Sequence, residues 1–514
     1  MSLPTPSLST AIAADQILYT AAQVRELDRL AIASGIAGFE LMRRAGQAAF
    51  DCVQQRWPDH SPLEVFCGGG NNGGDGYVVA ALAAEAGLPV RVWALASPES
   101  LSGDAALAAQ WARGAGVAIL PWQGERPEPG SVVVDTMLGI GLQGEVRGHY
   151  AAAILAVNSS AVPVLAIDIP SGLCSDSGRI LGIAIKADET LSFIGLKRGL
   201  FTLDALECVG VLHFASLAIP RAIYGQLREE QLGGAVGHLS VGAMLAAWGP
   251  RPRNAHKGVA GHVLVVGGDY GMAGAALLAA SAAARSGAGL VSCATRPEHV
   301  AALLAARPEL MAHGVNTAQD LQSLLVRATV VVIGPGLGQQ AWGREMLAAA
   351  LAANKPMLFD ADALNIIASE PQLLLSHRGP RILTPHPGEA ARLMACSTAA
   401  LQADRFAAAT VMADRFTASV LLKGSGTVIA ADSSLYLCSG GNPGMASGGM
   451  GDVLSGVIGA FVAQGLSPER AVCLGACVHA EAADIAARAG ERGMLASDVI
   501  EQLRSVINGY AALS

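Results

Sequence analysis

The sequence contains little charge, few aromatic residues and no run of basic residues. Of its 514 residues only 15% are charged and 4% are aromatic, whereas 52% are hydrophobic. Disordered chains combine low hydrophobicity with high net charge, so this composition predicts a compact, helix-rich globular protein. The net charge of −8 argues against general binding to nucleic acid or to anionic membranes, because such binding depends on neutralising phosphates.

Long apolar runs and a regular cysteine pattern are also missing. No stretch of about 18 residues is apolar without interruption by glycine, and the N-terminal residues lack the basic and apolar segments of a secretory signal. We therefore expect no membrane partner and a cytoplasmic location. The nine cysteines are scattered, which fits a reducing compartment. Cys473 and Cys477 have only His479 near them at ligand spacing, so they are interpreted as buried thiols and not as metal ligands.

The first half alternates short apolar segments with alanine-rich helical ones. Two helices are expected between residues 20 and 57, with a break near Ser34 and Gly35 and a capping box of Thr20 and Gln23 at the start. Strands are predicted at residues 63–67, 90–95, 117–120, 131–135 and 162–168. Apolar strands that alternate with helices indicate a parallel sheet covered on both faces. We predict a Rossmann-like, three-layer α/β domain over residues 1–225.

The second half carries a different series of strands and helices. It follows the stretch "GPRPRNAHKG", with strands predicted within residues 261–269, 289–295, 330–338, 356–362, 381–389 and 419–426, and mostly helix after Gly451. A chain of this length exceeds the size at which a single core stops growing, so two domains are expected. Because the halves do not repeat each other, we interpret the chain as a fusion of two different α/β domains, 1–225 and 226–514.

A glycine-rich turn joins the strand at 63–67 to the next helix. The stretch "FCGGGNNGGDGYVVAAL" contains G-x-G-x-x-G at residues 68–73, and such a turn can bind anions because free N–H groups and the helix dipole converge there. A dinucleotide dehydrogenase also needs an acid after its second strand to hold the ribose. Leu95 and Ala96 occupy that place, and Glu99 lies already in the loop. This absence excludes the dehydrogenase interpretation. A plain tight turn is the alternative, which the neighbouring amides and acid argue against.

Two acids stand at the ends of predicted strands of the same sheet. Asp135 ends "SVVVD" and Asp168 ends "VLAID", and ligands of open α/β sheets bind beyond the carboxyl ends of the strands. Either acid alone could simply cap the next helix, but three polar loops at one sheet edge favour a shared pocket. The oxygens of Asn72, Asp135 and Ser171 would also suit a hard monovalent or divalent cation.

Four ordered motifs of this half resemble the YjeF N-terminal domain, the NAD(P)H-hydrate epimerase family. They are "GGGNNGGDGYVVA", "VDTMLGIGLQGEVRG", "AIDIPSGLCSDSG" and "TLSFIGLKRGL". The resemblance implies binding of NAD(P)H that carries water at C6, and interconversion of its R and S epimers. It implies K⁺ ligands at Asn72, Asp135 and Ser171, with Asp168 as the candidate acid/base and Asp135 as the second. The implied hydrate contacts are Asn71, Asn72, Gly73, Gly74, Asp75, Gly139, Ile140, Gly141, Leu142, Gln143, Gly144, Glu145 and Asp168.

The strongest catalytic pattern of the second half is "NPGMASGGMGDVLSG", residues 442–456. Its glycines precede an apolar helix, where backbone N–H groups can hold the oxygens of a transferring phosphoryl group. Asp452 is then placed to take a proton from an attacking hydroxyl, although an aspartate at a helix start can also be an ordinary cap. No G-x-x-x-x-G-K-[ST] motif is present, which excludes a P-loop enzyme.

The order of a "GPGLG" loop, "TPHPGE", "KGSGT" and G-x-G-D resembles the ribokinase-like superfamily. In "TPHPGE" the resemblance assigns Glu389 the Mg²⁺ side, while His386 replaces an asparagine and would face the substrate. Together with "RPRNAHKGVAGHVLVVGG" these motifs closely resemble the ADP-dependent (S)-NAD(P)H-hydrate dehydratase domain. The implied hydrate contacts are Ala275, Gly338, His386 and Asp452. The implied nucleotide contacts are Lys423, Gly424, Ser425, Gly426, Thr427 and Gly451.

Taken together, the motifs predict a bifunctional enzyme that repairs NADHX and NADPHX, the hydrated cofactors. The first domain would interconvert the epimers with K⁺, and the second would dehydrate the S-hydrate with Mg²⁺ and ADP as co-substrate, releasing AMP and phosphate. A homo-oligomer is expected, and no nucleic-acid partner. Two alternatives remain at this point: a pyrimidine or vitamin kinase with a regulatory N-terminal domain, and a binding module whose N-terminal domain is an inert scaffold for a protein partner.

Overall fold

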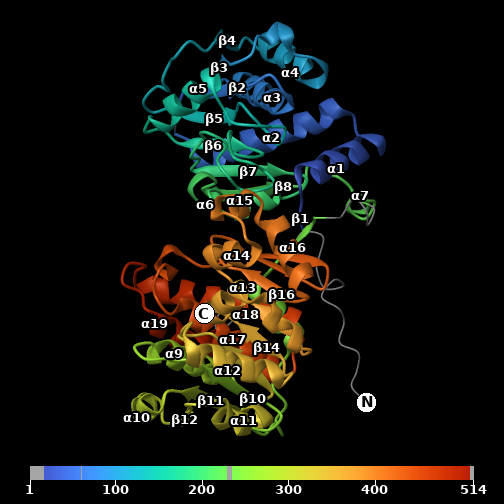
Figure 1. The fold of residues 1–514 in the computed structure, drawn as a ribbon. Helices are drawn as coiled ribbons and strands as arrows, with labels where there is room; N and C mark the ends of the chain where they lie inside the picture. The colour runs from blue at the N-terminus through green and yellow to red at the C-terminus, as the bar shows by residue number, and fades with distance from the viewer. Residues whose placement is uncertain (1–16, 60, 228–233, 510–514) are drawn as a thin grey trace. The chain divides into compact units, whose positions relative to one another are not determined.

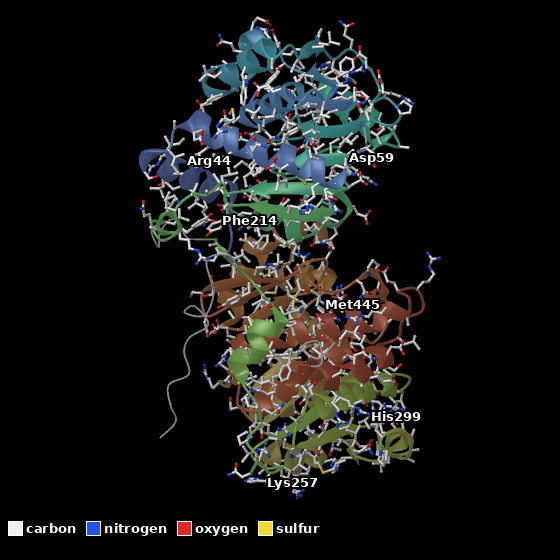
Figure 2. The ribbon with its side chains drawn as sticks, turned by 180° about the vertical axis from the view of Figure 1, so that it is seen from behind. Arg44, Asp59, Phe214, Lys257, His299 and Met445 are labelled. Atoms are coloured by element: carbon white, nitrogen blue, oxygen red, sulfur yellow. The ribbon has the colours of Figure 1, made fainter. Side chains whose placement is uncertain are left out.

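The computed structural model describes residues 17–59, 61–227 and 234–509. This chain divides into two compact units, residues 17–236 and residues 237–509. The boundary expected at 225/226 directly follows α7 (Arg221–Tyr224). Figure 1 shows a sheet covered by helices in each unit. In Figure 2, Arg44, Asp59 and Phe214 mark the first unit, and Lys257, His299 and Met445 mark the second.

The first unit begins with two helices before its sheet. Helix α1 (Ala21–Ala33) starts at Thr20, whose hydroxyl accepts a hydrogen bond from the Gln23 amide while the Gln23 side chain accepts one from the Thr20 amide. The predicted capping box and the predicted break before α2 (Gly38–Arg56) are therefore confirmed. The other elements before the middle of the sheet are β1 (Ile17–Leu18), β2 (Leu63–Cys67), α3 (Asn71–Glu85), β3 (Val90–Ala94), η3 (Pro98–Ser100), α4 (Gly103–Gly114) and β4 (Ala118–Pro121).

The sheet of this unit is entirely parallel, in the order β4-β3-β2-β5-β6-β7-β8. The chain runs outward from β2 through β3 to β4 and then crosses back to β5, so the topology switches between β2 and β5. A crevice beyond the carboxyl ends of the strands opens at such a point. The remaining elements are β5 (Val132–Thr136), α5 (Gly148–Asn158), β6 (Val164–Ile167), β7 (Glu189–Phe193), η4 (Arg198–Phe201), α6 (Ala205–Cys208) and β8 (Val211–Ala215).

Alternating strand residues build a core on each face of the sheet. On one face Val65 packs in a cluster with buried residues of α2, α3 and α4. On the other face Phe66 packs with Ile154 and other residues of α5. Because successive strand residues point to opposite faces, a strand that is buried along its whole length, such as β2, serves both clusters at once. This confirms the predicted three-layer Rossmann-like arrangement.

The second unit is built around a larger sheet in the order β9-β18-β17-β16-β15-β14-β13-β10-β11-β12. The pairs from β12 to β16 are parallel, whereas β16, β17 and β18 are antiparallel. Its strands are β9 (Val236–His238), β10 (His262–Val266), β11 (Leu290–Thr295), β12 (Met311–Gly314), β13 (Val330–Ile333), β14 (Met357–Phe359), β15 (Arg381–Leu383), β16 (Ser419–Leu422), β17 (Thr427–Ala431) and β18 (Ser434–Cys438).

The helices of this unit cover its mainly parallel sheet, which agrees with the α/β domain expected here. Helix α17 packs closely against α9 and the sheet, which two glycines make possible. A Cβ at Gly456 would overlap the Ala279 carbonyl, and one at Gly459 would overlap Val332. The helices are α8 (Val241–Trp248), α9 (Ala273–Arg285), η5 (Pro297–His299), α10 (Val300–Ala306), α11 (Ala318–Arg327), α12 (Ala341–Ala352), α13 (Ala361–Ser369), η6 (Pro371–Ser376), α14 (Pro387–Met394), α15 (Thr398–Ala403), α16 (Arg405–Phe416), η7 (Pro443–Met445), α17 (Met450–Ala463), α18 (Pro468–Ala486), η8 (Ala487–Ala489) and α19 (Ala496–Ile507).

Two further features concern the predicted buried thiols and the membrane-spanning helices that the sequence led us not to expect. Cys473 and Cys477 are buried on α18 as free thiols. Within the described ranges, no helix is long and apolar enough to cross a membrane.

Candidate functional site

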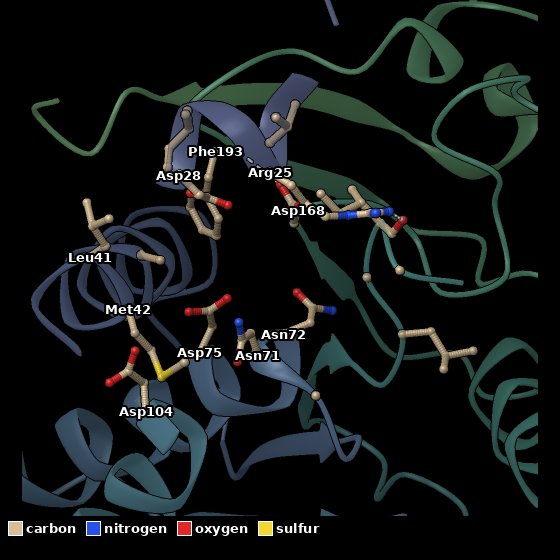
Figure 3. Close-up of a pocket in the computed structure, with 18 of the residues that line it drawn as sticks. Arg25, Asp28, Leu41, Met42, Asn71, Asn72, Asp75, Asp104, Asp168 and Phe193 are labelled. Carbon is tan, nitrogen blue, oxygen red and sulfur yellow. Dashed lines mark hydrogen bonds between the residues drawn. The ribbon is translucent and has the colours of Figure 1, made fainter. Parts of the chain in front are cut away.

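A cavity of about 690 Å³ lies in the first unit at the crevice between β2 and β5. Polar residues of several elements line it. Arg25 and Asp28 belong to α1, Asn72 and Asp75 belong to α3, and Asp168 directly follows β6. Figure 3 shows Asp28, Asp75, Asn72 and Asp168 pointing into the same space. The apolar part of the wall includes Val24, Ile32, Leu41, Met42, Met137, Phe193, Ile194 and Leu217.

The glycine turn before α3 has a steric basis. A Cβ at Gly68 would overlap the carbonyl oxygen of Met137, and one at Gly73 would overlap the carbonyl oxygen of Gly68. The turn therefore lies directly against the residues after β5. Gly70 is different: it is the N-cap residue of α3 and has open space around its Cβ position. No side chain caps this helix end, so its first amides face the cavity side as anion donors.

Gly68→Ala is expected to destabilise the first unit and to lower its activity at least tenfold. The added Cβ would overlap the backbone of Met137, which cannot move aside as a flexible side chain could. Overpacking of this kind costs about 1–3 kcal/mol, and small displacements of a site reduce rates strongly. Gly114→Ala is the matched control, since its added methyl meets nothing and the residue does not line the cavity. Thermal unfolding and substrate turnover of both variants check this. Equal behaviour of the two would contradict the steric explanation.

Asp168 is held by a buried lysine. The side chain of Lys197 has no exposed surface and pairs with the Asp168 carboxylate. Its Nζ also donates to Ser192 Oγ at 3.0 Å and to the Phe193 carbonyl at 3.1 Å. The Phe193 amide donates to Asp168 Oδ1 at 3.3 Å. Asp168 has a left-handed backbone (φ +67°), a conformation that costs free energy for a non-glycine residue and is found most often at functional sites.

Two other carboxylates of the cavity, those of Asp28 and Asp75, lack such a partner. No hydrogen bond reaches the Asp28 or the Asp75 carboxylate from any residue that the structure describes. Burial, together with the charge of Asp168, raises the pKa of Asp28 to about 6, and Lys197 acts against this rise. Burial and the charges of Asp168 and Asp28 raise the pKa of Asp75 well above its ordinary value. The cavity therefore combines one paired carboxylate with two that are prone to hold a proton.

Asp135 and Ser171 lie beneath the cavity wall and have no exposed surface. The Ser171 hydroxyl donates to Asp135 Oδ1 at 2.6 Å, and the Ser171 amide donates to Oδ2 at 2.8 Å. Burial raises the pKa of Asp135 to about 6 despite these hydrogen bonds. The Asn72 amide group is buried, and neither its oxygen nor its nitrogen has a partner in the described chain. An unpaired amide oxygen beside buried carboxylate and hydroxyl oxygens fits a hard cation such as K⁺.

The residues expected to contact the hydrate occupy two layers. Lining the cavity are Asn71, Asn72, Asp75, Gly139, Ile140, Gly141, Leu142, Gln143 and Asp168. Gly73 and Gly74 are buried in the packing of α3, against the Gly68 backbone and against Met42 and Ala105. Gly144 and Glu145 continue the loop outside the cavity lining, and Glu145 forms an exposed ion pair with Arg147 at 2.8 Å.

A separate polar cluster lies at the opposite, N-terminal end of β7. The ligand atoms of Cys52, Glu189 and His213 lie within 4.8 Å of one another, the one such group in the described chain. Glu189 is buried and pairs with Arg56 on one oxygen and with His213 Nε2 at 2.7 Å on the other. These two partners already satisfy the buried charge.

In the second unit, the candidate site lies at the start of α17. Gly449 is the N-cap residue in a left-handed conformation (φ +90°), where a side chain would also overlap Leu278. Asp452 follows in the first helical turn. Burial and the nearby Asp360 charge raise the pKa of Asp452 to about 7, and Lys423 acts against this rise. Asp452 is thus poised to exchange a proton near neutral pH.

Lys423, at the end of β16, turns its side chain toward these acids. Its Nζ lies 2.6 Å from Asp360 Oδ1, and Asp360 Oδ2 accepts a hydrogen bond from Ser455 at 2.7 Å. Burial lowers the pKa of Lys423, but the charges of Asp360 and Glu389 outweigh it, so the pKa is raised. A Cβ on Gly451 would stand 3.0 Å from Nζ. Only glycine therefore leaves free space in front of this ammonium.

Lys423 thus differs in its surroundings from the rest of its turn. Gly424 and Ser425 are exposed, and Gly426 has a left-handed backbone (φ +64°). The turn is fixed from behind by Arg405, which is buried and donates to the carbonyls of Leu422, Lys423 and Ser425. The predicted set of Lys423, Gly424, Ser425, Gly426 and Thr427 therefore combines an exposed rigid turn with a lysine directed at carboxylates.

His386 is the N-cap residue of α14. Its Nδ1 accepts from the Gly388 amide at 3.0 Å, and its own amide donates to Glu389 Oε2 at 2.8 Å. Burial and the charges of Lys423 and Arg392 lower the pKa of His386, so the imidazole is neutral at pH 7 with its proton on Nε2. Burial raises the pKa of Glu389, and the Asp360 charge adds to this.

Ala275 and Gly338 lie on the far side of this acid group. The Gly338 amide donates to Asp362 Oδ2 at 2.9 Å, and a Cβ on Gly336 would stand 3.2 Å from the Ala275 Cβ. The negative charge of Asp362 contributes to the raised pKa of Asp452. Gly338, His386 and Lys423 thus lie in the segments that follow β13, β15 and β16, and the charges of Lys423 and Asp360 act on the pKa of Asp452. Several carboxylates without a preformed cage suit Mg²⁺, which keeps water ligands and binds mainly through substrate phosphates.

Several charged residues of the two sites were not predicted. Lys197 and Asp28 in the first site, and Asp360, Asp362 and Ser455 in the second, had no assigned role. Asp360 could have been found, since it ends the apolar strand segment "PMLFD" in the same way as Asp135 and Asp168 end theirs. Lys197 stands beside Arg198 in the motif "TLSFIGLKRGL", which is a weaker signal. Asp28 lies at an ordinary helical position and gives none.

The two α/β units, one with a parallel and one with a mainly parallel sheet, and their acid-rich sites define a two-domain α/β enzyme. Residues 38–199 match the family described as YjeF-related protein N-terminus, and residues 263–505 match the family described as NAD(P)H-hydrate dehydratase. The chain is 48% identical to the bifunctional NAD(P)H-hydrate repair enzyme Nnr of Coxiella burnetii over 96% of its own length and 99% of that protein. It is 46% identical to the enzyme of the same name from Escherichia coli, over 92% and 90% of the two chains.

One similar solved structure is the ADP/ATP-dependent NAD(P)H-hydrate dehydratase of Bacillus subtilis, co-crystallised with ATP/Mg²⁺. The match covers 52% of this chain and 96% of that one, with 29% identity and a TM-score of 0.47. The near full-length relatives identify the family. The chain belongs to the bifunctional NAD(P)H-hydrate repair enzymes.

Proposed function

We propose that the first unit epimerises the R- and S-hydrates of NADH and NADPH at C6, and that the second dehydrates the S-hydrate at the expense of ADP. Membership of the repair-enzyme family supports the substrate. The observation that supports two separate reactions is the presence of two complete acid-rich sites, one in each unit, with Asp168 beside Lys197 in the first and Asp452 beside Lys423 in the second.

The first unit offers groups for proton transfer and for holding the nucleotide. Asp168 is our candidate acid/base, with Asp135 second, because Asp168 faces the cavity and Asp135 lies beneath its wall. The uncapped start of α3 and the loop at residues 139–143 would hold the dinucleotide. We assign Asn72, Asp135 and Ser171 as K⁺ ligands. A bound K⁺ would supply positive charge beneath the glycine turn.

In the second unit Asp452 takes the proton of the C6 hydroxyl, and the oxygen attacks the terminal phosphorus of ADP. The bond from this phosphorus to AMP breaks, leaving a phosphate ester at C6. The C6–O bond then breaks with phosphate as the leaving group, and loss of a C5 proton restores NAD(P)H. The amides before α17 face the transferring phosphoryl group. Glu389 would lie on the Mg²⁺ side, where the ion neutralises phosphate charge.

The substrate contacts proposed for this reaction are Ala275, Gly338, His386 and Asp452. The turn from Gly424 to Thr427, in which Gly424 and Ser425 are exposed, would hold the nucleotide, together with Gly451. Lys423 would contact the phosphates while its Nζ remains paired with the Asp360 carboxylate. The location in the cytoplasm and the homo-oligomeric state remain predictions, and sedimentation of the purified chain tests the latter.

The function is tested with separated R- and S-hydrates of NADH. With ADP and Mg²⁺, the S-hydrate should regain absorbance at 340 nm, and the R-hydrate should do so only as fast as the first unit converts it. ATP is compared in parallel. A stable phosphorylated product without NADH would instead favour the small-molecule kinase. If Asp168→Ala left repair of the R-hydrate at its original rate, the first unit would be a scaffold.

Dehydration of the S-hydrate is expected to rise with pH through about 7. Asp452 can accept a proton only when ionised, and its raised pKa of about 7 keeps it protonated and inactive below that value. The acid limb of kcat should therefore lie near 7 and not near the ordinary value of about 4. A profile flat between pH 5 and 8 would contradict this role. Buffer-matched measurements with the wild-type chain are sufficient.

A further inference from the structure

The epimerase cavity contains more carboxylates than a single proton transfer requires. Asp28, Asp75 and Asp168 come from α1, α3 and the end of β6, three elements that are far apart in the sequence. Figure 3 shows their carboxylates around one space. Asp168 has Lys197 and the Phe193 amide as partners, whereas Asp28 and Asp75 have no hydrogen bond from the described part of the chain. Two unsatisfied carboxyl groups at a cavity surface are available to a bound substrate.

Neither Asp28 nor Asp75 forms an ion pair with a described residue of the chain. Lys197 contacts Asp168 directly and acts on Asp28 and Asp75 only through space. Burial and the charges of Asp168 and Asp28 raise the pKa of Asp75 well above its ordinary value, so the surroundings of Asp75 favour its protonated form. The other charged or ionisable groups near this carboxyl are Arg25, which donates to the Ile140 carbonyl at 3.3 Å, Asp104, Tyr150 and the buried Cys67 thiol.

We propose that Asp75 is the proton donor of the epimerisation, that Asp168 with Lys197 is the proton acceptor, and that Asp28 is a positioning residue that keeps the proton on Asp75. This assignment rests on the proposed function of the first unit. It separates two kinds of carboxyl group by their surroundings: a neutral one without a cationic partner and an ionised one beside a buried ammonium. Pairs of acids with opposite protonation states are a common basis for acid–base catalysis.

The reaction balances with these two groups and water. Asp75 gives its proton to the C6 hydroxyl, and the C6–O bond breaks with its electron pair leaving on the oxygen of water. The lone pair of the ring nitrogen forms a C6=N double bond meanwhile. Water then attacks the other face of C6: a lone pair of its oxygen forms the new C–O bond, the electron pair of the C6=N double bond returns to the ring nitrogen, and one proton of the water passes to Asp168. The reverse reaction, or exchange with solvent, returns the proton to Asp75.

Asp75→Asn should lower enzymatic R-to-S conversion by about 100-fold or more, since an amide retains the shape but has no acidic proton. Asp51→Asn is the matched control, an exposed aspartate on α2. Dehydration of pure S-hydrate by the same full-length protein should be unchanged, and thermal unfolding of the first unit at the wild-type temperature verifies its fold. Conversion within threefold of the wild-type rate would overturn the assignment. If the wild-type chain itself does not accelerate conversion, the proposed function fails instead.

Asp28→Asn distinguishes a positioning role from a structural one. Loss of this negative charge lowers the pKa of Asp75, so the alkaline limb of the kcat profile for epimerisation should move about one unit or more toward lower pH. The rate on the acid side of this limb should be retained, and Asp28→Glu should restore the wild-type limb. A loss of rate that is equal at every pH, with the limb in place, would overturn the role assigned to Asp28.

Discussion

Asp452→Asn is expected to lower dehydration of the S-hydrate by about 10²–10⁴-fold, the usual contribution of a general base. The side chain stands in the first turn of α17, behind two glycines and near Lys423 and Asp360. Asparagine retains the size and the position but cannot take the proton of the C6 hydroxyl. Epimerisation should be unaffected, because none of its residues lies in the second unit.

Single-turnover assays with S-hydrate and ADP measure this effect, and chromatography of the R- and S-hydrates measures epimerisation on the same preparation. Glu501→Gln, an exposed acid on α19, is the control for loss of one negative charge from the unit. Loss of both activities in Asp452→Asn would contradict the assignment of separate sites. A loss of less than tenfold in dehydration would assign the proton to another group.

Lys423→Met should lower the stability of the second unit by about 3–5 kcal/mol, because it leaves the buried Asp360 carboxylate without its cation. Asp360 has 1% of its side chain exposed, and Lys423 has 20%. Dehydration should be lost as well, since Asp452 and Glu389 then lack their nearest positive charge. Urea unfolding followed separately for each unit measures the change in stability.

The double variant Lys423→Met/Asp360→Leu separates stability from catalysis. Removing both charges should restore most of the lost stability, because replacing a whole buried pair by apolar side chains is often neutral. Dehydration should remain absent. If Lys423→Met alone unfolds at the same urea concentration as the wild type, Asp360 does not depend on this lysine for its charge balance.

Much of the fold could be predicted from the order of apolar and helical segments. Strands such as β2 and β5 are buried on both faces, and continuous apolar runs of this kind are typical of parallel sheets. The capping box at Thr20 was predictable because both partners lie within one helical turn. Asp135 and Asp168 were predictable as site residues because the carboxyl ends of parallel strands meet at one edge.

The remaining features depend on contacts that no local pattern encodes. Lys197 and Asp168 are separated by 29 positions, and only the pairing of β6 with β7 brings them together. Asp28 reaches the cavity because α1 packs there, which its helical sequence does not reveal. Lys423 was grouped with its turn by proximity in the sequence, whereas its side chain leaves the turn to meet Asp360. Side-chain direction at a strand end depends on the charges that surround it.

Each unit supplies all the side chains that we assign to its own site. The first set lies between Arg25 and Lys197, and the second between Ala275 and Ser455. Because both units belong to one chain, the two catalytic sites are always made in equal numbers, and a change in expression cannot alter their ratio. Any adjustment of one activity against the other has to come from substitutions within a unit. Directed evolution of such a chain would reveal which of the two activities limits cofactor repair in the cell.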